Sequence, residues 1–138
     1  MTVTVDINVL MNVLQMREPH YAASAQVVSM VVDGTLIGVC PAHGLTTLYY
    51  LVRKHASKPD AEAAMDRVLD HFQIGSLDAA GWQEARHLPL DDFEDSAVAA
   101  VATATASAFI ITRNVSDFSG SLVPAITPAD FLSQLLPN

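Results

Sequence analysis

The sequence predicts an α/β protein, a three-layer α/β/α sandwich around a mostly parallel central sheet. Short β-branched or aliphatic runs alternate with helical segments along the whole chain, an order typical of parallel sheets with helices on both faces. The 138 residues are the length of one ordinary domain. Because no internal repeat, low-complexity tract or linker interrupts them, we expect residues 1–138 to form a single domain.

The first half of the chain predicts two strands and three helices. The β-branched run VTV at residues 3–5 ends at Asp6, and NVLMNVLQM then spaces its apolar residues at helical intervals. LIGV predicts a second buried strand that leads into the single cysteine, Cys40, and HGLTTLYYLVRKH predicts a helix with basic residues in its last turn. Before LIGV, the segment YAASAQVVSMVVDG predicts a helix that Gly34 ends and whose apolar face holds Ala22, Ala25, Val28 and Val32.

The second half continues the alternation. Pro59 opens a helix over DAEAAMDRVLDHF, QIGS predicts a strand, and a further helix begins near Asp78 and ends before Pro89. A long helix from about residue 93 to about residue 106 precedes a strand at AFIIT and a loop at RNVSDF, and an edge strand near VPAI precedes a final helix capped by Thr127. The amphipathic pattern after Pro59 rests on Ala63, Val68, Leu69 and Phe72.

Composition limits the class of protein. The formal net charge of −8 argues against nucleic-acid binding through an all-over basic surface, because such binding neutralises phosphates. It leaves a metal-dependent enzyme open, since bound cations offset acidic residues in an active site. The apolar stretches are too short to span a membrane, and no export signal precedes the first strand. We therefore expect a cytoplasmic protein without a membrane partner.

Acidic and amide side chains follow the predicted strands. Asp6 ends the first strand, and Asn114 and Asp117 lie in the loop after FIIT. Asp92 and Asp95 are three residues apart at the start of the long helix, so they lie on one face of its first turn. Because active sites of parallel sheets gather beyond the carboxyl ends of the strands, we expect these side chains to meet at one edge of the sheet.

Two interpretations of these carboxylates stay open. An Asp in the first turn of a helix is often a cap or a partner of the helix dipole, and Asp92 fits that role. The alternative is a metal site, because Mg²⁺ and Mn²⁺ prefer carboxylate and water ligands. Bound by Asp6, Asp95 and Asp117, with Asp92 beside them, such a cation would activate water for attack on phosphorus. Phosphodiester hydrolysis is the reaction that follows.

Several segments resemble one family. VTVDINVLMNVL is similar to the opening motif of PIN-domain ribonucleases, and DFEDSAVAAVATATASAFIITRNVSDF resembles their closing acidic half. REPHYAASAQVV, LTTLYYLVRK and ITPADFL extend the resemblance over nearly the whole chain. It implies a compact α/β/α fold, Mg²⁺- or Mn²⁺-dependent cleavage of RNA and, in many members, the role of toxin in a VapBC-like toxin–antitoxin pair. A cognate antitoxin is therefore an expected partner, and we also expect a homodimer.

The resemblance assigns roles by position. Asp6, Asp95 and Asp117 match the family's acids, and Asn8 matches the amide that steadies the site. Asn114 falls where many members have Asp, which makes it a catalytic candidate. The chain departs from the family at one point, because Thr47 aligns with a Glu. A hydroxyl is a weak metal ligand, so this departure also favours a second hypothesis, a catalytically weakened PIN-like binding or regulatory module.

Four further side chains are candidates for contact with substrate. Arg113 precedes Asn114 and is expected to contact a phosphate. Thr112 and Ser116 flank the same loop and would either bind the scissile phosphate or tie the turn. The fourth candidate is Thr47, the residue that aligns with the family's Glu. Glycine-rich phosphate loops and paired zinc-binding histidines are absent from the sequence, which removes the nucleotide-binding and zinc alternatives.

Overall fold

The computed structural model describes residues 1–135, and the last three residues of the predicted domain lie outside this range. Within it a five-stranded sheet has the order β3-β2-β1-β4-β5, and all four strand pairs are parallel. The strands are β1 (Thr2–Val5), β2 (Ile37–Pro41), β3 (Gln73–Gly75), β4 (Phe109–Ile111) and β5 (Ala125–Ile126). The prediction of a mostly parallel sheet with β5 at its edge is confirmed.

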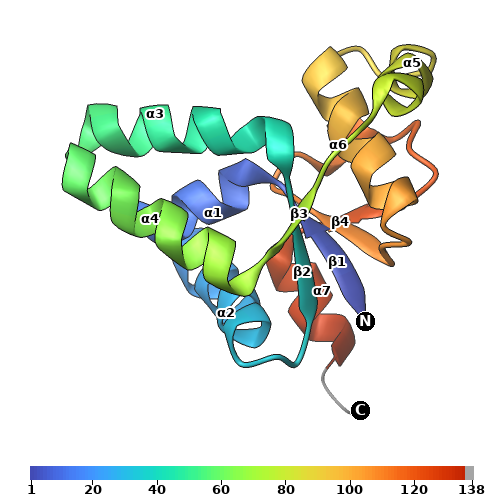
Figure 1. The fold of residues 1–138 in the computed structure, drawn as a ribbon. Helices are drawn as coiled ribbons and strands as arrows, with labels where there is room; N and C mark the ends of the chain where they lie inside the picture. The colour runs from blue at the N-terminus through green and yellow to red at the C-terminus, as the bar shows by residue number, and fades with distance from the viewer. Residues whose placement is uncertain (136–138) are drawn as a thin grey trace.

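Helices cover both faces of this sheet (Figure 1). The α-helices are α1 (Ile7–Leu14), α2 (Tyr21–Val32), α3 (Leu45–His55), α4 (Lys58–His71), α5 (Ala79–Arg86), α6 (Phe93–Ala104) and α7 (Pro128–Leu135). Two 3₁₀ turns, η1 (Ala42–Gly44) and η2 (Val115–Phe118), follow β2 and β4. Figure 1 places α1 to α4 on one side of the sheet and α5 and α6 on the other, so the three-layer α/β/α prediction is confirmed.

The sequence explains where several helices begin. Ser57, Asp78 and Asp92 have extended backbone at the start of α4, α5 and α6, and each side chain accepts a backbone N–H from the first turn of its helix. The hydroxyl of Thr127 caps α7 in the same way, accepting the N–H of Asp130 at 3.1 Å. These bonds satisfy N–H groups that have no partner within the helix.

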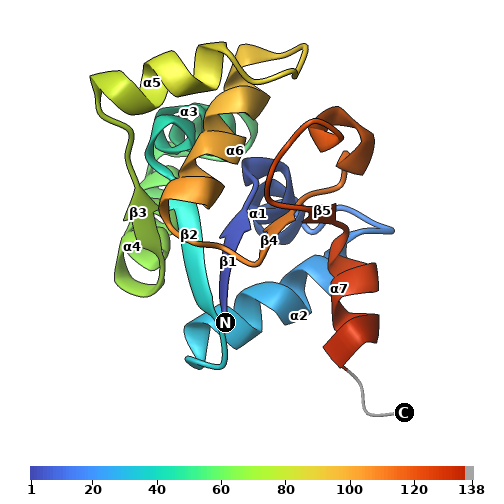
Figure 2. The same cartoon turned by 90° about the vertical axis from the view of Figure 1, so that its right-hand side faces the viewer.

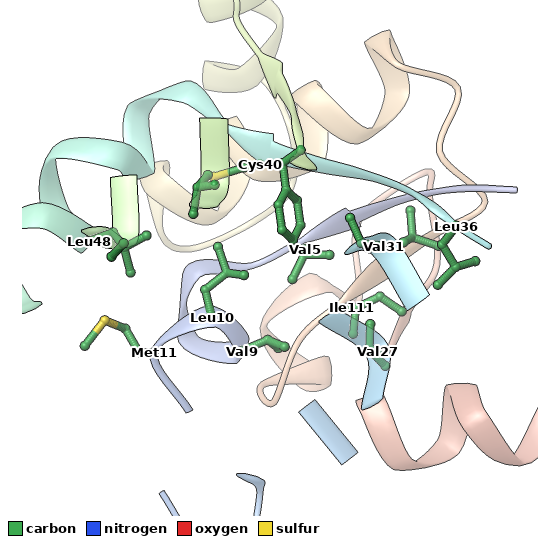
Figure 3. Packing of buried hydrophobic residues seen from close by; sticks show 14 of the residues in the cluster. Val5, Val9, Leu10, Met11, Val27, Val31, Leu36, Cys40, Leu48 and Ile111 are labelled. Carbon is green, nitrogen blue, oxygen red and sulfur yellow. The ribbon is translucent and has the colours of Figure 1, made fainter. Parts of the chain in front are cut away.

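The larger hydrophobic core lies between the sheet and helices α1 to α4 and α7 (Figure 3). Val3 and Val5 of β1 and Ile111 of β4 point into it and are fully buried. A second cluster on the opposite face joins Val98 and Ala102 of α6 to β4 and to the segment after it. Because both faces are covered, β2 and β4 have apolar residues in consecutive positions, and in β1 the hydroxyl residue Thr4 is buried along with its Val neighbours.

Two helix faces differ from the sequence prediction. On α2 the buried side chains are Ser24, Val27 and Val31, and Val32 is 50% exposed. Ser24 turns inward because its hydroxyl accepts a hydrogen bond from Nδ2 of buried Asn12 at 3.4 Å. Nearly every position of this helix is apolar or small, so its periodicity did not identify the buried face.

On α4 the prediction of Ala63 and Leu69 on the apolar face was wrong. Leu69 is 56% exposed, whereas Ala61, Ala64 and Val68 are buried. Small alanines allow α4 to pack closely on α3, and the larger Leu69 lies outside this contact. No helix in residues 1–135 is long and apolar enough to cross a membrane.

Candidate functional site

Asp6 stands at the carboxyl end of β1, where the strand order reverses between β1 and β4. Its side chain is only 8% exposed. The Thr112 hydroxyl and Nδ2 of Asn8 both donate to its Oδ2, at 3.0 Å and 3.2 Å. Ligands of open α/β sheets bind at such a switch point, so the protein holds a nearly buried carboxylate in the place where substrate is expected.

Opposing effects act on the pKa of Asp6. Burial raises the pKa above its ordinary value, because a desolvated carboxylate loses favourable hydration. The hydrogen bond from Thr112 and one from the backbone of Ile7 lower it, and the charge of Glu94 raises it again. His43 has a small lowering effect, which also places this imidazole in the neighbourhood of the carboxylate. The net pKa of Asp6 is raised.

Thr112 and Asn8 form a small network that holds Asp6 in place. The Thr112 hydroxyl accepts the N–H of Asn114 at 3.1 Å while it donates to Asp6. Oδ1 of Asn8 accepts the backbone N–H of Arg113 at 3.4 Å. These bonds tie β1 to the segment after β4, two parts of the chain more than a hundred residues apart. Thr112 and Asn8 therefore position the carboxylate.

The second group of acids, Asp92 and Asp95, lies at the beginning of helix α6. Oδ1 of Asp92 accepts the N–H of Asp95 at 3.0 Å, so Asp92 does cap the helix, as one of the two interpretations expected. Asp95 follows in the first turn and is half-buried. It is fixed on α6 by the packing of Ala97, Val98 and Val101, which are buried against the sheet and the segment after β4.

The acids of α6 and η2 share one cleft. A cavity of about 390 Å³ is lined by Asp92 and Asp95 on one side and by Ser116 and Asp117 on the other, with Asp91 at its rim. Asp6 is not part of the lining, but its charge still reaches Asp95. We call this cavity the acidic cleft.

Mutual repulsion in the acidic cleft changes the pKa of Asp95. Partial burial and the charges of Asp92, Asp6, Asp117 and Glu94 together raise that pKa to about 6. All of these effects act in the same direction, and no cation is among them. A set of carboxylates that repel one another is stabilised by any cation that binds between them. The charges of Asp6 and Asp117 therefore both act on the pKa of Asp95.

The residues of the acidic cleft fit a hard divalent cation by their chemistry. Carboxylate oxygens are the preferred ligands of Mg²⁺ and Mn²⁺. Within residues 1–135, however, no three His, Cys, Asp or Glu side chains are placed to hold one ion together. Mg²⁺ usually takes one or two carboxylates and completes its shell with water and substrate phosphate. The arrangement matches that open type of site and not a closed protein cage.

Other predicted site residues lie apart from the cleft. The Arg113 side chain lines a different pocket, between the beginnings of α2 and α7. Asn114 precedes η2, is exposed, and makes no capping bond with its side chain. Thr47 is half-buried in the first turn of α3, which follows β2 and η1 at the same edge of the sheet.

Three residues at this edge are not among the predicted site residues. Asp91 lines the acidic cleft, Glu94 raises the pKa of both Asp6 and Asp95, and His43 lies near Asp6 in η1. The signal that marks His43 is its place directly after β2, since residues after parallel strands reach the carboxyl edge. His43 also packs edge-on against Trp82, with ring centroids 5.7 Å apart.

Solved structures with the same fold show how widely it is shared. VapBC2 from Rickettsia felis, bound to a DNA fragment from its promoter, matches with a TM-score of 0.71 and 15% identity over 92% of this chain and 98% of that one. DNA-bound VapBC from Salmonella typhimurium gives 0.70 and 12%, over 93% and 98%. Mycobacterium tuberculosis VapC20, a sarcin–ricin loop cleaving toxin, gives 0.63 and 15%, over 78% and 86%. At these identities the likeness establishes the fold.

The sequence itself identifies the family. No match is found among curated proteins. The family model described as PIN domain matches residues 2–116, which contain β1 to β4, Asp6 and the first turn of α6. The resemblance stated from the motifs is therefore confirmed. The chain belongs to the PIN-domain family, in general a family of nucleases.

Proposed function

We propose that the protein is a metal-dependent endoribonuclease that hydrolyses phosphodiester bonds at the acidic cleft. The observation that carries this proposal is the lining of the acidic cleft, where Asp92, Asp95 and Asp117 lie together without a basic side chain from residues 1–135, and where partial burial and the neighbouring carboxylates raise the pKa of Asp95 to about 6. Such an arrangement costs stability, so it calls for a ligand that relieves the repulsion. Among the predicted ligands, Mg²⁺ or Mn²⁺ meets that need, and membership of a nuclease family supports the same reaction.

The predicted ligands are Asp6, Asp95 and Asp117, with Asp92 beside them. Since no three side chains in residues 1–135 are placed to hold one ion together, one or two of these carboxylates would contact the metal directly and the others would act through bound water. When bound, it supplies Lewis acidity and a water of lowered pKa. Thr112 and Asn8 orient the Asp6 carboxylate through their hydrogen bonds to Oδ2. Ser116, in the wall of the cleft, would offer a hydroxyl to a phosphate oxygen, and the exposed Asn114 lies two residues earlier in the chain.

RNA is the proposed substrate because the motifs resemble those of PIN-domain ribonucleases. The fold is also that of VapC20, whose name describes cleavage of the sarcin–ricin loop. With a net charge of −8, the surface as a whole repels nucleic acid. Binding must therefore rely on the cation in the cleft and on a few local contacts.

The proposal extends to the role of the protein in the cell. Two of the similar structures are VapBC assemblies bound to DNA, which supports a cognate antitoxin partner and the role of toxin for this chain. We further propose a homodimer, a cytoplasmic location and one domain over residues 1–138. Co-purification with the product of the neighbouring reading frame tests the partner, and a frame that encodes no small DNA-binding protein would count against it.

A cleavage assay tests the enzyme. RNA is incubated with Mg²⁺ or Mn²⁺ and with the wild type or the variants Asp6→Asn, Asp95→Asn and Asp117→Asn. We expect each substitution to lower the rate at least about a hundredfold, the scale of losing one charge-stabilising group. Asp70→Asn, a matched change on the exposed side of α4, should leave the rate unchanged. Equal cleavage by all five proteins would reject the proposal.

A second candidate is a PIN-like binding or regulatory module with a weakened site. Two observations favour it: Thr47 replaces the expected Glu, and residues 1–135 hold no ready three-ligand group. Such a module would bind RNA but would not cleave it in the presence of either Mg²⁺ or Mn²⁺. Measured binding together with no cleavage above a blank, at any metal concentration, would establish this alternative over the first.

A further inference from the structure

A second pocket opens at the same edge of the sheet, on the other side of the segment after β4. Its volume is about 220 Å³, and it is lined by the first turns of α2 and α7 and by Arg113. Figure 2 shows α7 beside α2, away from α6. His20, just before α2, and Ser24 of α2 line it on one side, and Thr127, just before α7, and Ala129 of α7 line it on the other. We call this cavity the Arg113 pocket.

The consecutive side chains of Thr112 and Arg113 point to different sites. The Thr112 hydroxyl donates to Asp6, whereas the next side chain, Arg113, lines the pocket. Nε of Arg113 is buried and finds no hydrogen-bond partner within residues 1–135. A buried donor without an acceptor costs free energy, more so on a charged group. Because the Arg113 side chain is only partly buried and lines the pocket, an acceptor that enters the pocket would contact the guanidinium and supply the partner that its Nε–H lacks in this conformation.

The two helix beginnings around Arg113 favour an anion as that acceptor. First-turn N–H groups carry the positive end of the helix dipole. In α2 the residue before the helix, His20, makes no capping bond with its side chain, so it does not satisfy those groups. In α7 the Thr127 hydroxyl caps the N–H of Asp130. No carboxylate lines the pocket.

We propose that the Arg113 pocket binds a backbone phosphate of the same RNA strand whose scissile linkage lies in the acidic cleft. This inference rests on the proposed nuclease function. A phosphate offers several oxygens, which suit a guanidinium and exposed backbone N–H groups at once. Because Arg113 and Thr112 are consecutive, the distance between the pocket and Asp6 is fixed by a rigid segment. The strand would thus be held close to carboxylates that otherwise repel it.

The salt dependence of RNA binding tests the pocket without any cleavage. Affinity for a short single-stranded RNA is measured in EDTA over a series of KCl concentrations. Each phosphate contact on a single strand contributes about 0.7 to the slope of log K against log [salt]. We expect Arg113→Gln to reduce the slope by about that amount and the low-salt affinity by about tenfold. Arg67→Gln, the same change on exposed α4, should alter neither.

A second measurement separates a strand phosphate from free phosphate. Inorganic phosphate is titrated into the ¹⁵N-labelled wild type and Arg113→Gln, and the amides of Ala23 and Ala129 are followed. We expect shifts at both in the wild type, lost in the variant and reproduced by the RNA. Shifts with phosphate but none with RNA would overturn the assignment to a strand, and shifts that persist in Arg113→Gln would overturn the pocket. The wild-type titration does not depend on how well the variant folds.

Failure of this inference and failure of the proposed nuclease can be told apart. A wild type that cleaves RNA while Arg113→Gln keeps the full salt slope would overturn the pocket and leave the nuclease standing. A wild type that binds RNA with an Arg113-dependent slope but never cleaves it would support the pocket and reject the nuclease. No RNA binding at any salt concentration would overturn the pocket directly.

Discussion

The hydrophobic core between the sheet and its helices and the acidic cleft at the edge of the sheet differ in how their side chains affect stability. In the core, Val3, Val5 and Ile111 are fully buried among other apolar side chains, so every contact stabilises the fold. In the cleft, partial burial and the like charges around it raise the pKa of Asp95 to about 6, so ionisation there destabilises the fold. The comparison indicates that one set of residues stabilises the fold and another set forms the proposed active site.

A narrow polar layer separates the two regions. Asp6 follows Val5 directly, yet its carboxylate accepts two hydrogen bonds and is nearly buried. This layer fixes the position of Asp6, because the hydrogen bonds of Thr112 and Asn8 join β1 to the end of β4. Substitutions in the core, the layer and the cleft should therefore have distinct effects.

The largest expected effect on stability is in the core. Leu48 of α3 is fully buried, and Leu48→Ala should lower the free energy of unfolding by about 2–5 kcal/mol through lost burial and a cavity. Leu69→Ala removes the same atoms from an exposed position and should cost less than about 0.5 kcal/mol. Urea denaturation measures both, and similar losses would show that the described α4 face is wrong.

In the polar layer, Thr112→Val should affect both stability and pH dependence. It removes the donor to Asp6 and the acceptor of the Asn114 N–H, which should cost about 1–3 kcal/mol. Because the Thr112 hydrogen bond lowers the pKa of Asp6, the acidic limb of the cleavage–pH profile should move to higher pH. Thr112→Ser should keep the wild-type profile. An unmoved limb in the Val variant would contradict the positioning role.

In the first turn of α3, at the same edge of the sheet as the cleft, Thr47→Glu should strengthen metal binding. The substitution supplies the carboxylate that the resemblance expects, and one added ligand charge should tighten Mn²⁺ binding by about tenfold, equal to about 1.4 kcal/mol. Electron paramagnetic resonance of free Mn²⁺ measures the affinity. Thr46→Glu, one residue earlier and exposed, is the control. Equal gains in the two variants would indicate a general charge effect instead of a site.

The smallest expected effect is on stability at Asp95. A raised folded-state pKa means that the protonated carboxyl contributes stability, present in full below about pH 3.8 and lost as pH rises through about 6. In EDTA at pH 7.5, Asp95→Asn should therefore be more stable than the wild type, and the gap should close near pH 4. Thermal unfolding at both pH values measures this, with Asp70→Asn as a flat reference. A pH-independent gap would contradict the repulsion.

The fold followed from the sequence because its signals were local. Runs such as VTV and FII predicted strands, and Asp78, Asp92 and Thr127 marked helix starts that the structure confirms. The buried faces of α2 and α4 could not be predicted in the same way. On α2 small or apolar residues surround most of the circumference, and on α4 alanines lie on both the buried and the exposed face, so tertiary packing decides which of them face the core.

The site was predictable in outline and less so in detail. Parallel topology alone brings Asp6 and the segment with Asp117 to one edge of the sheet, and the structure gathers them around Asp95. The direction of Arg113 was not predictable, because backbone geometry after a strand end determines where a side chain points. The metal-ligand and catalytic roles of these residues stay predictions.

Binding of Mn²⁺ tests most directly whether Asp6, Asp95 and Asp117 form one cation site. Calorimetric titration of the wild type should give an affinity tighter than about 1 mM, and each of Asp6→Asn, Asp95→Asn and Asp117→Asn should weaken it at least about tenfold. Asp70→Asn should bind as the wild type does. Unchanged binding in all three cleft variants would contradict the account.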